Sequence, residues 1–206
     1  NKAKNGINND FKVSVIVPVY NAEKFVEEAV LSAVHLDEVG EIILIEDGSK
    51  DNSLLKCEEL SRNNEKVSLY VHENNQNKGA SESRNLGIQN AKFSYISFLD
   101  ADDIYNENRF EKDKNIFLSN LDIDGVYSAV GYLNEPDGKV FTLSKRIQPN
   151  QLFHYLLRGT YGHFHTNGIT VKSSVFNDTG YFNPKLTLIL SPHLDKKVSP
   201  DLVKIG

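Results

Sequence analysis

The stretch VSVIVPVYN, residues 13–21, decides the fold that we expect for this chain. Its β-branched run from Val13 to Val17 is nearly continuous, which is typical of a strand buried on both faces. Pro18 is expected to end this strand, because proline has no N–H to donate to a neighbouring strand. Apolar residues then recur at helical spacing over residues 22–36, and Asn21 is placed to cap that helix, which should cover one face of a sheet.

The alternation of strand and helix continues outward from this unit. Further strands are predicted over residues 41–46, 67–72 and 93–99, and helices are predicted after the candidate caps Asp51 and Asn52 and over residues 79–90. Strands that alternate with helices are joined by right-handed crossovers and pair in parallel. The chain is therefore predicted to form an α/β fold, a doubly wound and mainly parallel sheet flanked by helices.

The regular pattern weakens after Asp103. The later predictions are a helix over 108–119, a strand over 125–133, a turn at 136–138, a short strand over 139–143, a helix over 149–157 and a strand over 168–172. Residues 1–10 are polar and indicate a flexible leader. Residues 11–206 are expected to form one domain, because 206 residues with 39% hydrophobic content supply one sizeable core.

Composition argues against several classes of partner. A net charge of -5 disfavours nucleic acid and anionic membranes as default partners, because both require a basic surface. No apolar run approaches the roughly 20 residues that span a bilayer, so a cytoplasmic location is expected, with peripheral association at the inner face of the membrane left open. Cys57 is the only cysteine and lies in a predicted amphipathic helix, where we expect a core residue.

Asp100 and Asp102 directly follow the predicted strand at 93–99 and are two positions apart. If the extended backbone persists, their carboxylates project to the same side. Mg²⁺ and Mn²⁺ prefer oxygen ligands and commonly take one or two carboxylates together with substrate phosphates. The pair is therefore a candidate clamp for a divalent cation. The alternative is a turn or helix cap, where aspartates are also common.

Polar and aromatic residues also follow the first two strands. Asp47 comes after a buried strand, where its carboxylate is placed to accept a hydrogen bond from a base such as uracil. The alternative for Asp47 is a turn in which it binds only backbone groups. Tyr20 is a candidate for stacking on a base, although half-buried packing would explain it equally. The carboxyl ends of parallel strands share one edge, which is where ligands bind in such sheets.

Residues 77–87 place two cations, Lys78 and Arg84, near the start of a predicted helix. Free N–H groups and the helix dipole favour phosphate there, so a diphosphate site is predicted, although the glycine spacing matches neither a Walker A loop nor a dinucleotide loop. The alternative is a solvated helix face. His163 and His165 are spaced to share a face and help to hold a metal or an acceptor, and the alternative is an ordinary loop.

These residues together resemble family 2 glycosyltransferases of the GT-A fold. The matching stretches lie in order at residues 13–21, 45–51, 77–87 and 98–103, and a looser match continues to the turn at 180–183. The resemblance implies a mixed, mainly parallel sheet. It divides the domain into a nucleotide-binding half over 11–103, an acceptor-binding half over 104–188 and an irregular tail over 189–206.

The resemblance also implies a role for each matching position. Members of this family usually transfer a sugar from a nucleoside diphosphate donor, commonly UDP-linked, to a saccharide or lipid-linked acceptor with inversion, and they use Mn²⁺ or Mg²⁺. The roles carried over are Pro18 and Tyr20 beside the base, Asp47 accepting from it, Lys78 and Arg84 near the diphosphate, Asp100 at the ribose and metal, and Asp102 at the metal.

The chain departs from the family pattern after Asn183, where a Glu-Asp pair usually supplies the general base. No such pair follows here, and Asp195 is the nearest acid. The absence of methionine from the chain suggests a segment missing between Leu188 and Ile189. The alternative function is a non-catalytic nucleotide-sugar-binding protein or partner subunit. A sugar nucleotidyltransferase is less favoured, because no glycine-rich loop follows the first strand.

Overall fold

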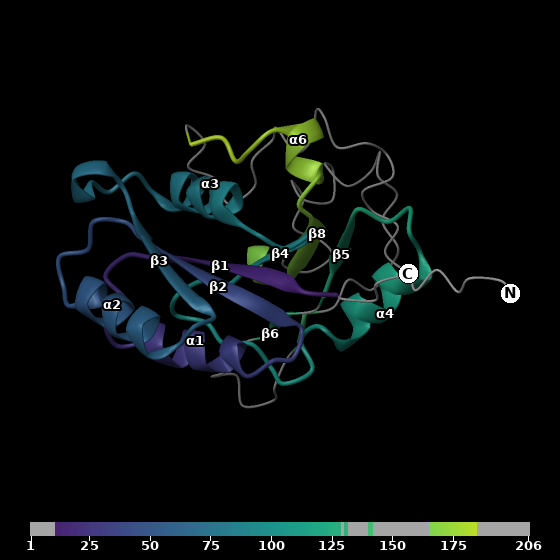
Figure 1. Ribbon diagram of the computed structural model, residues 1–206, viewed down its shortest axis with the longest axis horizontal. Helices are drawn as coiled ribbons and strands as arrows, with labels where there is room; N and C mark the ends of the chain where they lie inside the picture. Colours follow the sequence, from purple (N-terminus) through teal and green to yellow (C-terminus); the bar gives the residue numbers. More distant parts are fainter. Residues whose placement is uncertain (1–10, 129, 132–139, 142–164, 185–206) are drawn as a thin grey trace, which may run out of the picture.

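The computed structural model describes residues 11–128, 130–131, 140–141 and 165–184. Its main element is a six-stranded sheet in the order β3-β2-β1-β4-β8-β5 (Figure 1). The strands are β1 (Val13–Val19), β2 (Val39–Glu46), β3 (Val67–Val71), β4 (Tyr95–Phe98), β5 (Gly125–Tyr127) and β8 (Ile169–Lys172). β1 to β4 pair in parallel, whereas β8 is antiparallel to β4 and β5. The predicted mixed, mainly parallel sheet is confirmed.

Helices cover both faces of this sheet (Figure 1). α1 (Val26–Val34) and α2 (Ser53–Asn63) lie on one face, and α3 (Ala80–Asn90) and the short α6 (Val175–Thr179) lie on the other. Side chains of β1 alternate between two apolar cores, because Val15 and Val17 join the core under α1 while Ile16 joins the core with Ile88 of α3. This explains the unbroken apolar run, since both faces of β1 are buried.

Two predicted segments form, but their details differ from the prediction. The helix predicted from residue 22 begins at Val26, and Asn21 does not cap it but has a φ of 51° and accepts a hydrogen bond from the Lys50 amide. The strand predicted over 125–133 is split, because β5 joins the main sheet while β6 (Val130–Gly131) pairs with β7 (Val140–Phe141) in a second sheet. The predicted turn at 136–138 and helix at 149–157 lie outside the described residues.

Other boundaries are close to their predictions. α2 begins after Asn52, but Asp51 supplies the capping interaction, because its Oδ1 accepts from the Ser53 amide at 3.0 Å. α4 (Glu111–Ser119) starts three residues later than predicted and places Phe117 against Phe11 and Tyr95. Residues 1–10 lie outside the described part of the chain.

Pro18 ends only one of the two ladders that β1 makes. β1 pairs with β2 along its whole length, up to Val19 opposite Glu46, but its pairing with β4 stops at Ile16 opposite Phe98. The last bond on that side runs from the Leu99 amide to the Ile16 carbonyl at 3.0 Å. Pro18, two residues further along, faces the same side and has no N–H to offer, so the sheet opens between β1 and the chain after β4.

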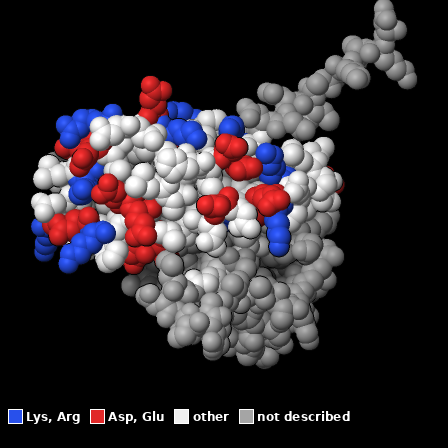
Figure 2. Space-filling model, turned by 90° about the horizontal axis from the view of Figure 1, so that it is seen from below, with Lys and Arg blue, Asp and Glu red and all other residues white. Residues whose placement is uncertain are grey.

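The face formed by α1 and α2 carries acidic and basic side chains interspersed rather than a continuous basic area (Figure 2). No helix in the described part of the chain has the length and apolar character needed to cross a bilayer.

Gly87 sets how closely α3 approaches the sheet. A Cβ added at this position would lie 2.4 Å from Cγ2 of Ile16, a fully buried residue of β1. Such a distance forces either the helix or the Ile16 side chain to move. The close approach matters because α3 carries Arg84 toward the open end of the sheet.

We expect Gly87→Ala to lower the free energy of unfolding by about 1–3 kcal/mol, because overpacking outweighs the better helix propensity of alanine. Urea denaturation followed by circular dichroism measures this change. Gln89→Ala, an exposed position on the same helix, is the control and should change stability little. Equal or greater stability of Gly87→Ala would show that α3 has room to shift.

Cys57 belongs to α2 and is fully buried, which confirms its predicted place in the core. Burial, together with the negative charges of Glu46, Asp51 and Glu58, raises the pKa of its thiol to about 12. We therefore expect the native protein to react with a thiol reagent at pH 8 very slowly, and the denatured protein to react at once. Fast labelling of the native chain, measured by mass spectrometry, would contradict this burial.

Candidate functional site

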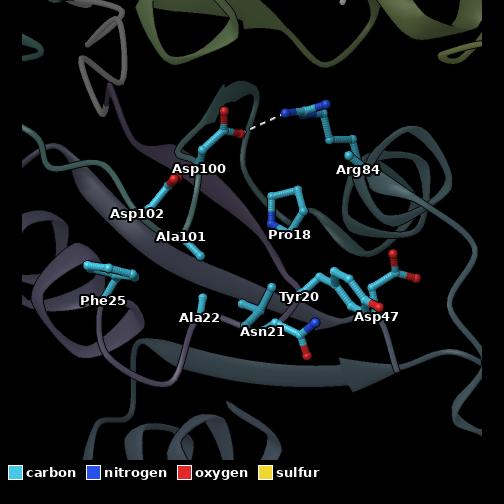
Figure 3. Close-up of a pocket in the computed structure, with 12 residues that line it drawn as sticks. Pro18, Tyr20, Asn21, Ala22, Phe25, Asp47, Arg84, Asp100, Ala101 and Asp102 are labelled. Carbon is cyan, nitrogen blue, oxygen red and sulfur yellow. Dashed lines mark hydrogen bonds and ion pairs between the residues drawn. The ribbon is translucent and has the colours of Figure 1, made fainter. Parts of the chain in front are cut away.

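A cavity of about 290 Å³ lies where the sheet opens between β1 and β4. Strand order reverses at this point, because β2 and β3 lie on one side of β1 and β4 on the other. Doubly wound sheets bind ligands in such crevices. Six of the seven residues predicted to bind the donor line this cavity, as Figure 3 shows, namely Pro18, Tyr20, Asp47, Arg84, Asp100 and Asp102.

The loops after β1 and β2 are tied together on one side of the cavity. The Asn21 amide donates to Ser49 Oγ at 3.0 Å, and the Ala22 amide donates to Ser53 Oγ at 2.8 Å. Buried Glu46 shapes the second loop by accepting from the Gly48 and Ser49 amides. Tyr20, at 46% exposure, and Phe25, at 50%, therefore present open aromatic surfaces beside the cavity from a firmly held backbone.

Asp47 is buried at the end of β2, and both its oxygens accept hydrogen bonds from backbone amides. Oδ1 accepts from Lys78 at 2.6 Å and Oδ2 accepts from Gly79 at 2.9 Å, while Nε2 of the buried His72 lies 3.5 Å from Oδ1. These hydrogen bonds agree with the alternative considered for Asp47, a turn in which its carboxylate binds backbone groups. Each carboxylate oxygen can accept more than one bond, so Asp47 still has a lone pair for a ligand in the cavity.

The acidic stretch after β4 forms a turn rather than continuing the strand. The Asp103 amide donates to the Asp100 carbonyl at 3.0 Å, so the expectation of an extended backbone from Asp100 to Asp102 is wrong. The sheet provides no partner strand here, which lets the chain turn. Asp100 and Asp102 nevertheless both line the cavity, with Asp102 exposed and Asp100 partly buried.

The turn brings Asp100 and Asp103 close to His165, which comes from a distant part of the chain. One ligand atom of each lies within 4.8 Å of the others, and His165 Nε2 is 3.9 Å from Asp100 Oδ2. Burial raises the pKa of the Asp103 carboxyl, and the Asp102 and Asp100 carboxylates raise it further. Several carboxylates that repel one another are a suitable setting for a divalent cation.

Arg84 reaches across the cavity to this acidic turn (Figure 3). Its Nη2 donates to Asp100 Oδ1 at 2.7 Å. The guanidinium carbon lies 6.0 Å from the ring centre of Phe182, and that ring packs edge-on against Phe98. The next residue, Asn85, binds both the amide and the carbonyl of Phe182 at 2.8 Å. The turn at 180–183 thus supports Arg84 from behind.

Of three other predicted residues, one lies away from the cavity and two lie outside the described residues. Lys78 is exposed and does not line the cavity, and its contribution is the backbone amide that Asp47 accepts. His163 and Asp195 lie outside the described residues. His165, considered beside His163, is the one of these histidines that the structure places near the acidic turn.

A buried polar network that the sequence did not reveal holds the acidic turn in place. Asn167 accepts from the Asp100 amide and donates to the Asp103 carboxylate. Arg109 donates to the Asn167 carbonyl and to Asp113, whose ion pair at 2.7 Å is almost wholly buried. Thr170 Oγ1 also donates to Asp113. The only sequence signal was an Arg and an Asp at i and i+4, which usually indicates a surface pair.

Fold and site together define a doubly wound α/β protein. Its cavity lies where the strand order reverses, and it combines carboxylates, an arginine and exposed aromatic rings. The family model for glycosyl transferase family 2 matches residues 14–172, which include every described residue lining this cavity. The chain therefore belongs to glycosyl transferase family 2.

Curated relatives agree with this family. An uncharacterized glycosyltransferase of Haemophilus influenzae is 37% identical over 109 residues, which cover 52% of this chain and 43% of the relative. The minor teichoic acid biosynthesis protein GgaA of Bacillus subtilis is 28% identical over 196 residues, covering 84% of this chain and 43% of GgaA. The chain thus spans less than half the length of either relative.

Solved structures share the fold at low sequence identity. TarS of S. aureus, crystallised as residues 1–349 with UDP-GlcNAc, has a TM-score of 0.64 at 22% identity, and the match covers 84% of this chain and 48% of that crystallised chain. The mannosyltransferase PcManGT from Pyrobaculum calidifontis, in complex with GDP-Man and Mn²⁺, has a TM-score of 0.67 at 18% identity and covers 95% and 54%.

The buried pair gives a direct test of what supports the acidic turn. Asp113→Asn leaves the Arg109 charge buried without its partner, so we expect the free energy of unfolding to fall by about 3–5 kcal/mol. Urea denaturation measures it. Glu27→Gln removes the same charge from the exposed pair with Lys56 and should leave the denaturation midpoint nearly unchanged. Equal effects of the two substitutions would argue against a supporting role for the network.

Proposed function

We propose that the cavity between β1 and β4 binds the donor of a sugar-transfer reaction, a nucleoside diphosphate sugar with uridine as the base. The observation that carries the proposal is the convergence of Asp47, Arg84, Asp100 and Asp102 on one cavity from two strand ends and a helix. Family membership supports the reaction class. The structures of TarS with UDP-GlcNAc and PcManGT with GDP-Man support a nucleotide-linked sugar as the ligand.

The residues of the cavity suit different parts of such a ligand. Pro18 and the exposed ring of Tyr20 would lie against the base, and the free lone pairs of Asp47 would accept its imide N–H. Arg84 would donate to oxygens of the diphosphate, since a guanidinium binds such oxygens with charge-assisted hydrogen bonds. Asp100 would also lie near the ribose. In this proposal residues 11–103 form the donor-binding half.

The acidic turn fits a divalent cation, Mn²⁺ or Mg²⁺. Asp100 and Asp102 would hold it, and Asp103 and His165 are the nearest additional ligand groups. The closeness of ligand atoms from Asp100, Asp103 and His165, all within 4.8 Å of one another, supports this fit, and PcManGT was solved with Mn²⁺. Such a cation neutralises the charge that develops on a departing nucleoside diphosphate.

Binding of the acceptor substrate is the role left for the part of the chain after Asp103. We propose that residues 104–188 contribute to binding a saccharide or lipid-linked acceptor, and that transfer proceeds with inversion. The relatives GgaA and GgaB of Bacillus subtilis, both named for minor teichoic acid biosynthesis, support an acceptor in a cell-surface polymer. Inversion by direct displacement requires a general base on the acceptor hydroxyl.

Calorimetric titration with UDP tests the donor and cation sites together. We expect UDP to bind in the presence of Mn²⁺ and to bind at least about tenfold more weakly in EDTA, because the cation bridges carboxylate and diphosphate. Asp102→Asn should weaken Mn²⁺-dependent binding to a similar extent. Asp122→Asn, an exposed aspartate that does not line the cavity, is the matched control. Binding that is indifferent to Mn²⁺ and to Asp102→Asn would overturn the metal role.

A further inference from the structure

We propose that Arg84 acts as a charge latch on Asp100, pairing with it when the cavity is empty and transferring its hydrogen bonds to the nucleotide when cation and donor bind. This inference rests on the proposed function and goes beyond it. In this proposal the Arg84 guanidinium is the group through which binding of the cation affects the affinity for the nucleotide. The latch is defined as the Arg84–Asp100 ion pair.

The first observation is that Arg84 is already paired with the Asp100 carboxylate, which is one of the proposed ligands of the cation. Arg84 Nη2 lies 2.7 Å from Asp100 Oδ1, and the two side chains are only 14% and 28% exposed. A pair this shielded from solvent is screened less than a surface pair. A divalent cation that approaches Asp100 therefore meets a positive charge already bound to the same carboxylate.

The second observation is the charge balance of the acidic turn. Asp100, Asp102 and Asp103 lie within four residues, and the turn carries Asp100 and Asp103 within reach of one another. Arg84 is the cation bound to this turn by an ion pair in the described structure, and His165, at 3.9 Å, adds charge only if it is protonated. Without a metal, Arg84 offsets part of this repulsion. Once a divalent cation binds, the same guanidinium becomes a source of repulsion.

The third observation is that Arg84 has unused hydrogen-bonding capacity. Its Nε is buried and has no hydrogen-bond partner among the described residues. A guanidinium presents five N–H donors in a fixed planar arrangement, and the bond to Asp100 uses only one of its nitrogens. An anionic ligand in the same cavity would supply the acceptors that Asp100 alone does not.

The surroundings keep Arg84 at the cavity in either state. Its base is fixed on α3, its guanidinium carbon lies 6.0 Å from the Phe182 ring centre, and Phe182 is held through its backbone by Asn85. Arg84 therefore does not need to leave the cavity when Asp100 releases it. Only its partner changes, from a carboxylate of the chain to oxygens of the nucleotide.

The latch predicts effects of opposite sign for one substitution. Arg84→Gln removes the repulsion, so Mn²⁺ alone, without nucleotide, should bind about fivefold more tightly than to the wild type. UDP at saturating Mn²⁺ should bind about tenfold more weakly, because its charge-assisted donor is lost. Isothermal titration calorimetry measures the UDP affinity, and electron paramagnetic resonance of free Mn²⁺ measures the cation affinity.

Two further variants separate charge from structure. Arg84→Lys keeps the positive charge, so Mn²⁺ alone should bind within about twofold of the wild type. Arg62→Gln makes the same change at an exposed position of α2 outside the cavity and should alter neither affinity. A general loss of structure in Arg84→Gln would weaken both ligands together and would not produce opposite signs.

The outcomes distinguish the latch from the function on which it rests. A wild type that binds neither Mn²⁺ nor UDP overturns both proposals. A wild type that binds both, with Mn²⁺ affinity unchanged or reduced in Arg84→Gln, overturns the latch and leaves the donor site standing. Tighter Mn²⁺ and weaker UDP in Arg84→Gln, with Arg84→Lys close to the wild type for Mn²⁺, support the latch.

Discussion

The end of the β1–β4 ladder is the constraint on which the site depends. Pairing stops at Ile16 and Phe98, and Pro18 prevents β1 from offering another N–H on that side. The chain after β4 is then no longer paired with β1, and it forms the acidic turn beside the cavity. The cavity is thus a direct result of hydrogen bonds that the two central strands do not make.

A gap in a sheet has to be held open, and polar contacts do so on both sides. Asn167 fixes the acidic turn from one side, supported by the buried pair of Arg109 and Asp113. Asp47 fixes the start of α3 from the other side through the Lys78 and Gly79 amides. Buried polar groups of this kind stabilise only when their partners are present, so the site is built from interdependent contacts.

The core of the fold and the strand-end acids could be predicted because they depend on local signals. Continuous β-branched runs identified β1 and β2, and acids directly after strands identified Asp47 and Asp100. The prediction for Asn21 was wrong because contacts from the next loop, with Lys50 and Ser49, override its local capping preference. His165 and Asn167 meet the acidic turn from more than 60 residues away, and no local pattern encodes that encounter.

Asn85 links α3 to a segment of the chain that is far away in sequence. Its carboxamide donates to the Phe182 carbonyl and accepts from the Phe182 amide, as the backbone of a neighbouring strand would. These two hydrogen bonds fasten α3 to the chain after α6. Arg84, one residue earlier, projects into the cavity. Any displacement of α3 would therefore be passed through the Asn85 side-chain amide to the backbone of Phe182. The two hydrogen bonds therefore couple the position of the Arg84 side chain to the position of a segment that follows it by almost 100 residues.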